Sequence, residues 1–229
     1  MSPVSLTSSG RGRGRPRVPL ERIAHAALEL VDEGGPQALT MRALAARLNS
    51  GVAVLYRAVP GRSDLIAVVI DQVLGDADFS ALGDGDASEP AGWEAVCRAT
   101  AVTLFETLAA HPGVASLLVE HVPTGPNALA LRERVLSLLL ANGFSASDAA
   151  RTYATLARLV IGFAAQLQAE SETDHEQIRS VFSDLDAATF PATVAAADVL
   201  PYQQLVDEFR TALDWLIAGL SVERGRAVA

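Results

Sequence analysis

The chain has 229 residues, half of them apolar, which is enough to bury the core of one large or two small domains. Its formal net charge is −9, and its single cysteine, Cys97, excludes an internal disulfide, so we expect a reduced, cytoplasmic protein. No run of about 18 uncharged apolar residues occurs and the N-terminus lacks the pattern of a secretory signal, so neither a membrane span nor a membrane partner is expected.

The charge is distributed unevenly along the chain. Residues 1–62 carry nine arginines and four acidic residues, whereas the remainder carries nine arginines and 23 acidic residues. Residues 1–18 are mostly Ser, Gly, Pro and Arg, and are predicted to be a disordered basic arm. The asymmetry indicates a head that binds a polyanion, joined to an acidic body. An inert tail is the alternative interpretation of the arm.

Short helices with sharp breaks between them are predicted in the basic part of the chain. A first helix should span 19–33 and end at a Gly-Gly-Pro sequence. Thr40 should cap a second helix over 41–48, and after a three-residue break a third helix should span 52–59. Ser63 should then cap a fourth helix.

The rest of the sequence is predicted to be helical after a linker over 76–91 that is rich in Gly, Asp, Ser and Pro. Long runs of alternating β-branched residues are missing, so an all-α fold is expected. The predicted helices lie near 92–110, 113–121, 127–141, 146–170 and 202–219, with irregular stretches around 122–126 and 171–200. Gly143 is expected to end one of these helices and Ser145 to cap the next.

Two short helices joined by a three-residue turn, after a longer helix, have the spacing of a helix-turn-helix. In that motif the second short helix enters the major groove of DNA. Short helices joined by such turns also occur in ordinary all-α cores, and the basic charge of this part favours the DNA-binding interpretation. We therefore predict a helix-turn-helix domain over 19–64 and a second helical domain over 65–229.

The segments "LTMRALAARL" and "LYRAVPGRSDLIAVVID" carry the most specific signal in the chain. They resemble the N-terminal signature of the TetR family of transcriptional regulators, and the resemblance covers residues 20–71. It implies a ligand-responsive homodimer, most often a repressor, that binds a palindromic double-stranded DNA operator. The matching residues are Leu39, Thr40, Arg42, Leu44, Ala45, Leu55, Tyr56, Arg57, Val59, Arg62 and Leu65.

Candidate DNA contacts come from the arm and from the two short helices. Hydroxyl and guanidinium groups can donate to phosphate oxygens, and Arg42 could also reach a guanine edge. Thr40 could act only as a cap, Tyr56 could be half-buried core, and Arg57 could be a solvated charge. The apolar recognition helix leaves specificity to thymine methyl contacts and DNA shape. The predicted contacts are Arg15, Arg17, Thr40, Arg42, Gly51, Val52, Ala53, Tyr56 and Arg57.

A second resemblance concerns "HPG", the long segment over 125–164 and the late "FRTALDWLIAGL". These resemble the C-terminal domain of the tetracycline-repressor subgroup, in which the helices that correspond to 146–170 and 202–219 form the dimer. Each helix here carries an apolar stripe, although an intramolecular core would explain each stripe separately. The stripes comprise Ala149, Tyr153, Leu156, Val160, Phe163 and Leu167, and Tyr202, Leu205, Phe209, Leu213, Leu216 and Leu220.

The same resemblance implies a cavity for an unknown small-molecule effector. Candidate ligand contacts are polar or aromatic residues on apolar helices, for each of which a core or surface role is the alternative. They are Phe105, His121, Arg134, Tyr153, Arg158, Phe163 and Gln166. His121 lies near the position of a metal-binding histidine of the tetracycline repressors, but Gln166 replaces their glutamate. An amide is a poor ligand for magnesium, so no metal site and no cofactor are predicted.

Catalytic patterns are not found in the sequence. The four histidines are scattered without metal-ligand spacing, and Cys97 has no histidine near it in sequence. We therefore predict a transcriptional regulator and not an enzyme. The alternatives are a helical ligand-binding dimer without sequence-specific DNA recognition, and an all-α enzyme with an unrecognised site.

Overall fold

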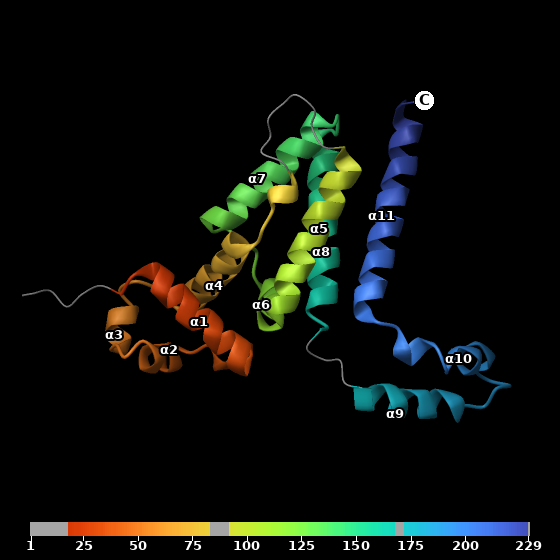
Figure 1. The fold of residues 1–229 in the computed structure, drawn as a ribbon, viewed down its shortest axis with the longest axis horizontal. Helices are drawn as coiled ribbons and strands as arrows, with labels where there is room; N and C mark the ends of the chain where they lie inside the picture. Colours follow the sequence, from red (N-terminus) through yellow and green to blue (C-terminus); the bar gives the residue numbers. More distant parts are fainter. Residues whose placement is uncertain (1–17, 83–91, 168–171, 229) are drawn as a thin grey trace, which may run out of the picture.

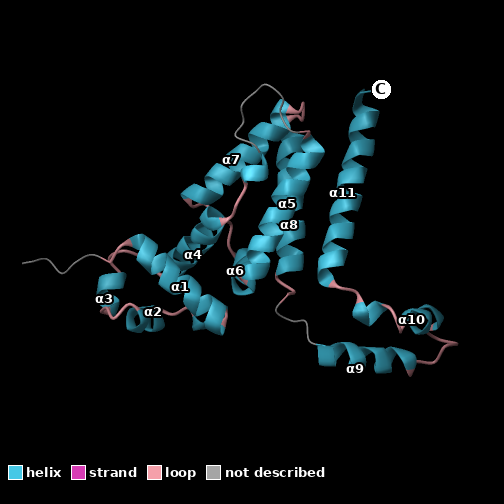
Figure 2. Ribbon diagram, viewed as in Figure 1, coloured by secondary structure: helices cyan, strands magenta, loops and turns pink. Residues whose placement is uncertain are grey.

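The computed structural model describes residues 18–82, 92–167 and 172–228, and within these ranges the chain forms helices and turns without a strand (Figure 2). The all-α prediction is therefore confirmed. Most of the predicted arm and most of the predicted linker lie outside the described residues. The described helices form a small head at one end and a larger body, with α9 and α10 standing away from both (Figure 1).

The head contains the four predicted helices, with two corrections. They are α1 (Leu20–Gly34), α2 (Met41–Arg47), α3 (Val52–Leu55) and α4 (Arg62–Asp76). The cap at Thr40 is confirmed, because the Ala43 N–H donates to Thr40 Oγ1 at 3.1 Å. The cap at Ser63 is wrong, since α4 begins at Arg62, two residues earlier than predicted, and Gly61 precedes it without a side-chain cap. The third helix is shorter than predicted, because residues 56–58 form a hydrogen-bonded turn and not a further turn of α-helix.

Seven further helices follow the head among the described residues, five of them in the body and two, α9 and α10, standing away from it. They are α5 (Trp93–Ala110), α6 (Pro112–Glu120), α7 (Pro126–Ala141), α8 (Ala146–Ala164), α9 (Glu172–Ser183), α10 (Pro191–Ala196) and α11 (Leu205–Val228). The predicted Ser145 cap of α8 is confirmed, because the Asp148 N–H donates to Ser145 Oγ at 3.1 Å. Gly143, which has a φ of +79°, follows the end of α7.

Residues 171–200 were expected to be irregular, and the structure corrects this with α9 and α10. The segment was difficult to predict because α9 packs against η3 (Leu200–Tyr202) and α10 and not against the main core. Its apolar residues Ile178 and Val181 are consequently exposed, so no buried stripe marks the helix. Glu176 supports the helix locally, through an ion pair with Arg179 at 3.3 Å and a hydrogen bond from the Tyr202 hydroxyl.

The central helix α4 joins the head to the body. It packs on α1 in the head and on α5, α6 and α7 in the body. Asp71 of α4 also caps a body helix, because the Ala128 N–H in the first turn of α7 donates to Asp71 Oδ1 at 3.0 Å. The predicted division between 64 and 65 thus falls inside a continuous helix, whose buried residues include Leu65, Ile66, Val69, Ile70 and Val73.

The body core lies between α5, α7, α8 and α11, which pack on one another. The predicted stripes of α8 and α11 contribute to this core, where Leu156, Val160, Phe209 and Leu213 are all buried. The buried part of each stripe therefore faces inwards within one protomer, whereas Tyr202 lies in η3 ahead of α11 and is exposed.

In the described ranges, no single helix is both long enough and apolar enough to cross a membrane. Only α5 and α6 taken together would satisfy that test, and they meet at an angle of 113°.

Candidate DNA-binding head and ligand cavity

The two short helices of the head are held at a fixed angle by a small apolar core. Leu44 of α2, Leu48 directly after it and Leu55 of α3 are buried in the same apolar cluster as residues of α1 and α4. Asn49 makes the turn between α2 and α3 with a φ of +48°, a left-handed conformation that asparagine tolerates better than most residues. This is the predicted helix-turn-helix geometry.

The outward surface of the motif carries most of the predicted DNA contacts. Thr40, Arg42, Ala53 and Arg57 are exposed, and so is Gly51 at the start of α3. Arg15 and Arg17 lie outside the described residues. The side chain of Tyr56 is 50% exposed, so it is not core, whereas Val52 is half-buried against the core. Exposed guanidinium, phenol and hydroxyl groups on one short motif can bind the phosphates of a duplex.

Arg47, which was not among the predicted residues, fixes α2 against α1. Its guanidinium pairs with Glu29 at 3.2 Å and also with Glu33. The hydrogen bond from Arg47 lowers the pKa of the Glu33 carboxyl and raises the pKa of the guanidinium itself. A second arginine has a similar role, because Arg62 Nη2 donates to the Pro36 carbonyl at 3.0 Å. Glu29 and Glu33 lie four residues apart on one face of α1, which is the sequence pattern that could have indicated a basic partner.

The body contains a cavity of about 580 Å³ between helices α4, α5, α6, α7 and α8. This volume is in the range of small-molecule sites. Each helix contributes at least one apolar wall residue, among them Leu74, Leu104, Leu118, Leu131 and Ile161. The cavity can therefore hold the apolar body of a small organic molecule.

Four polar side chains interrupt the apolar lining, namely His121, Arg132, Tyr153 and Arg158. His121 Nδ1 lies 3.1 Å from the Leu117 carbonyl, which can only accept, so Nδ1 carries the proton. In neutral His121 the other ring nitrogen is then an acceptor. Arg132 Nη2 donates to the Pro123 carbonyl at 3.0 Å, and its guanidinium lies 5.8 Å from the centre of the Tyr153 ring.

Three of the seven predicted ligand contacts line this cavity, and four do not. Phe105 is buried and stacks on Phe209 at 4.1 Å between ring centres, and Phe163 meets the same ring edge-on at 5.9 Å. Gln166 is exposed and donates to the Gly162 carbonyl at 2.9 Å. Arg134 is half-buried but lies outside the lining.

Arg132, which is not among the predicted ligand contacts, lines the cavity, whereas the predicted Arg134 does not. Helical phase could have indicated that Arg132 faces the cavity, because the buried residues of α7 are Ala128, Val135, Leu138 and Leu139. Arg132 follows Ala128 by four residues and precedes Val135 by three, so it shares their face. Arg134 lies on a different side of the helix.

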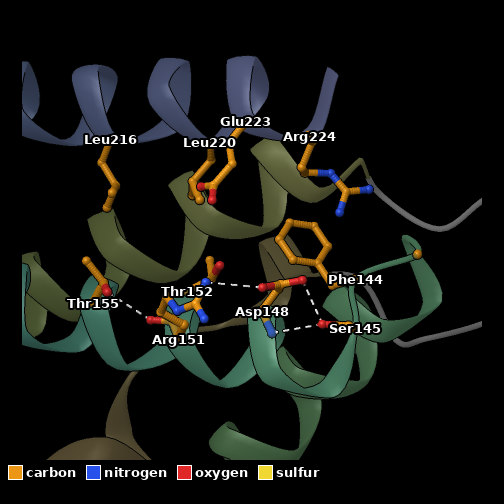
Figure 3. A pocket seen from close by; sticks show the side chains of 11 residues that line it. Phe144, Ser145, Asp148, Arg151, Thr152, Thr155, Leu216, Leu220, Glu223 and Arg224 are labelled. Atoms are coloured by element: carbon orange, nitrogen blue, oxygen red, sulfur yellow. Dashed lines mark hydrogen bonds and ion pairs between the residues drawn. The ribbon is translucent and has the colours of Figure 1, made fainter. Parts of the chain in front are cut away.

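A second hollow of about 530 Å³ lies between the start of α8 and the end of α11 (Figure 3). Three of its four charged side chains, Asp148, Arg151 and Arg224, are already engaged in an ion pair or with aromatic rings. Asp148 pairs with Arg151 at 3.3 Å, and the Arg224 guanidinium lies 3.8 Å from the centre of the Phe144 ring. Arg224 also donates to the Asn142 carbonyl at 2.9 Å. This hollow therefore offers a ligand fewer unengaged polar groups than the larger cavity.

Among the described residues, no group of three or more His, Cys, Asp or Glu side chains is arranged to hold a metal ion. Cys97 is fully buried in α5, and burial raises the pKa of its thiol to about 12. A neutral buried thiol is neither a nucleophile nor a metal ligand.

A helix-turn-helix head that shares a helix with a body holding a ligand-sized cavity defines a DNA-binding regulator that responds to a small molecule. Comparison with known proteins agrees with this class. Residues 23–69 match the sequence profile of the bacterial regulatory proteins of the tetR family, and residues 87–224 match that of the tetracyclin repressor-like C-terminal domain. The chain therefore belongs to the TetR family.

Two relatives extend this similarity along the chain. The chain is 31% identical to the HTH-type transcriptional repressor DrrR1 of Streptomyces coeruleorubidus, over 69% of this chain and 58% of that protein. The match thus spans less than two thirds of the length of DrrR1. The chain is also 29% identical to an HTH-type transcriptional regulator of Saccharopolyspora erythraea, over 94% of this chain and 89% of that one.

The fold is similar to that of ActR from Streptomyces coelicolor. The apo structure of ActR superposes with a TM-score of 0.81 and 28% identity, over 93% of this chain and all of the ActR chain. ActR has also been solved in complex with actinorhodin and with (S)-DNPA, and these structures superpose with TM-scores of 0.80 and 0.79.

Proposed function

We propose that this chain is a homodimeric repressor that leaves a palindromic operator when a small molecule enters the cavity between α4 and α8. The observation that carries this proposal is that the same helices contact both the head and the cavity. The ActR complexes with actinorhodin and (S)-DNPA support the presence of a small-molecule effector. The protein would act in the cytoplasm, on the chromosome, and the proposal assigns it no catalytic activity.

Helix α6 connects the two sites. At its start, Gly113 packs directly against Val31 of α1, and His111 Nδ1 lies 2.9 Å from Asp32 Oδ2 of the same helix. At its end, Leu118 and His121 line the cavity. A ligand that displaces the end of this nine-residue helix would therefore also move α1 and the attached motif.

Helix α4 provides a second connection. Leu74, near the C-terminal end of α4, lines the cavity. Arg62, the first residue of α4, donates a hydrogen bond to the carbonyl of Pro36, which precedes α2 in the chain. The dimer would exist in two conformations that differ in the spacing of their two heads, and the ligand would bind more tightly to one of them. In that conformation the heads no longer fit operator half-sites about 34 Å apart, so the protein leaves the DNA.

The outward faces of α8 and α11 are the surface on which we propose that two copies pair. Trp215 is 75% exposed and Val222 is 56% exposed, which is unusual for large apolar side chains on one helix face. Gly219, on the same face of α11, has no atom within 4 Å of the position that a Cβ would occupy. Glycine in a helix interior costs about 1 kcal/mol relative to alanine, and close approach of a second helix would explain why glycine stands at this position.

On DNA, the residues Thr40, Arg42, Tyr56 and Arg57 would bind phosphates and position α3 in the major groove, with Arg15 and Arg17 of the arm adding further contacts. The direct base contacts would come from Gly51, Val52 and Ala53. Since these three residues carry no hydrogen-bonding side chain, thymine methyl groups and DNA shape would supply most of the specificity.

The proposal is tested by titrating the purified protein with DNA from upstream of its own gene and with random DNA, across a salt series. We expect selective binding to the upstream DNA. A plot of the logarithm of the association constant against the logarithm of salt concentration should have a negative slope of about 0.9 for each phosphate contact. Arg57→Ala should weaken binding to all DNA sequences. It should also make the slope shallower by about the amount that one phosphate contact contributes. Arg179→Ala, on α9 away from the head and from the proposed dimer surface, is the matched control and should change neither quantity.

Equal affinity for own-promoter and random DNA, together with a genome-wide selection that returns no preferred sequence, would contradict the proposal. That result would favour a ligand-binding dimer without sequence-specific recognition.

A further inference from the structure

The cavity between α4 and α8 is positively charged, although the protein as a whole is acidic. Two of its sixteen lining residues, Arg132 and Arg158, carry permanent positive charge, and none of the described lining residues is Asp or Glu. The whole chain has 27 acidic residues against 18 basic ones. An apolar cavity with unbalanced positive charge is therefore a local feature of this site.

Neither arginine of the cavity is neutralised by a carboxylate in the described part of the chain. Arg132 is half-buried, and its one described hydrogen bond is to the Pro123 carbonyl at 3.0 Å. Arg158 is exposed at the edge of the cavity, and its Nη1 donates to the Ala154 carbonyl of its own helix at 3.2 Å. A guanidinium has five N–H donors, so both arginines retain donors for a ligand.

The second hollow provides an internal comparison. There Asp148 lies beside Arg151 and Glu223 lines the same wall as Arg224, so acidic and basic groups are balanced. The larger cavity is also lined by two arginines, Arg132 and Arg158, but by no described Asp or Glu. A partly buried guanidinium without a counter-charge is unfavourable, and binding of an anion there would offset that cost.

We propose that the effector of this protein is an anionic amphiphile, which is an apolar ring system bearing one negatively charged oxygen group such as a carboxylate or sulfonate. The ring system would fill the space between Leu104, Leu118 and Ile161. The charged group would bind Arg132 and Arg158, with Tyr153 beside it. This inference rests on the proposed function, because it specifies the ligand class of the same cavity.

The test uses two fluorescent probes that differ by one charged group. 1-Anilinonaphthalene-8-sulfonate is anionic, and N-phenyl-1-naphthylamine is the same ring system without the sulfonate. Each is titrated into the full-length protein at fixed salt, and dissociation constants and stoichiometry are obtained from the fluorescence. We expect the anionic probe to bind about tenfold more tightly, at one site per protomer, because a charge-assisted hydrogen bond contributes about that factor.

Variants locate the effect within the cavity. Arg132→Gln and Arg158→Gln should each weaken the sulfonate probe by about fivefold to tenfold and leave the neutral probe unchanged. Arg151→Gln, in the second hollow, should affect neither probe. Ala157→Phe narrows the cavity and should weaken both probes. A thermal denaturation curve for each variant checks that it is folded.

Equal affinity of the wild type for the two probes would overturn the inference, and so would an unchanged ratio of affinities in both Arg132→Gln and Arg158→Gln. The DNA titration described above is independent of these measurements. Selective DNA binding without preference for the anionic probe contradicts only the ligand class. Preference for the anionic probe without selective DNA binding contradicts only the repressor function.

Discussion

Cys97 lies on the buried face of α5, where its side chain has no exposed surface. Because desolvation disfavours the thiolate, burial raises the pKa of the thiol to about 12, and Glu94 one turn away adds to the shift. The residue is thus a small core side chain.

We predict that a disulfide reagent such as dithionitrobenzoate does not react with native protein at about pH 8, because the thiolate is both scarce and inaccessible. The same assay in denaturant should titrate one thiol per chain, since the sequence has a single cysteine. Fast reaction of the folded protein would contradict the buried position of Cys97.

Individual residues also mark the limit of sequence reasoning at the site. Thr40 and Ser145 were identified as caps because a cap depends on its own neighbours within three residues. Phe105 and Phe163 were assigned to a ligand, but both pack on Phe209, which is more than 40 residues away in sequence. A choice between ligand and core partner depends on packing that no local pattern contains.

At the scale of elements, the attachment of α2 to α1 depends on pH. The ion pair with Arg47 lowers the pKa of the Glu33 carboxyl below its ordinary value of 4.5. A carboxyl with a lowered folded-state pKa stabilises the fold above the unfolded-state pKa, and this contribution is lost as pH falls through the folded-state value.

We therefore predict that Glu33→Gln lowers the urea midpoint of unfolding at neutral pH, and that its difference from wild type shrinks as the pH falls below 4.5 through the lowered pKa of Glu33. Glu106→Gln changes an exposed carboxyl without a described ion pair, so it is the matched control. A difference between Glu33→Gln and wild type that stays constant with pH would exclude the ion pair as its cause.

The contact between α1 and α6 has little tolerance for added volume. A Cβ atom at Gly113 would lie 2.6 Å from Val31 Cγ1 and 3.1 Å from the Val31 carbonyl oxygen, so one helix would have to move. Gly113→Ala should lower the free energy of unfolding by about 1–3 kcal/mol, as overpacked cores do. Chemical denaturation measures this directly.

Gly225→Ala is the control for that substitution, because nothing lies within 4 Å of the position. Alanine favours the helix there, so the control should leave the protein as stable as wild type or slightly more stable. If Gly113→Ala were equally neutral, α1 and α6 would not be in the tight contact that the coupling of head and cavity requires.

At the scale of the whole molecule, the proposed dimer depends on the outward face of α11. Trp215→Glu should convert a dimer into a monomer in light scattering after gel filtration, because a buried charge would replace a large apolar anchor. Operator affinity should fall with it, since two linked heads bind much more tightly than one. Leu129→Glu changes an exposed apolar residue of α7 and should leave the dimer intact. A dimeric Trp215→Glu protein would place the interface elsewhere.

The sequence by itself determined the helices of the head, the caps at Thr40 and Ser145, and the family, because these depend on local spacing and on a short motif. The tertiary structure alone decided that Arg132 and not Arg134 enters the cavity, that the apolar stripes of α8 and α11 face the core, and that α9 is a helix away from it. The physical reason is that a helix presents several faces of similar composition. Packing against distant segments selects which face is buried, and that choice determines which side chains a ligand, an operator or a second copy can reach.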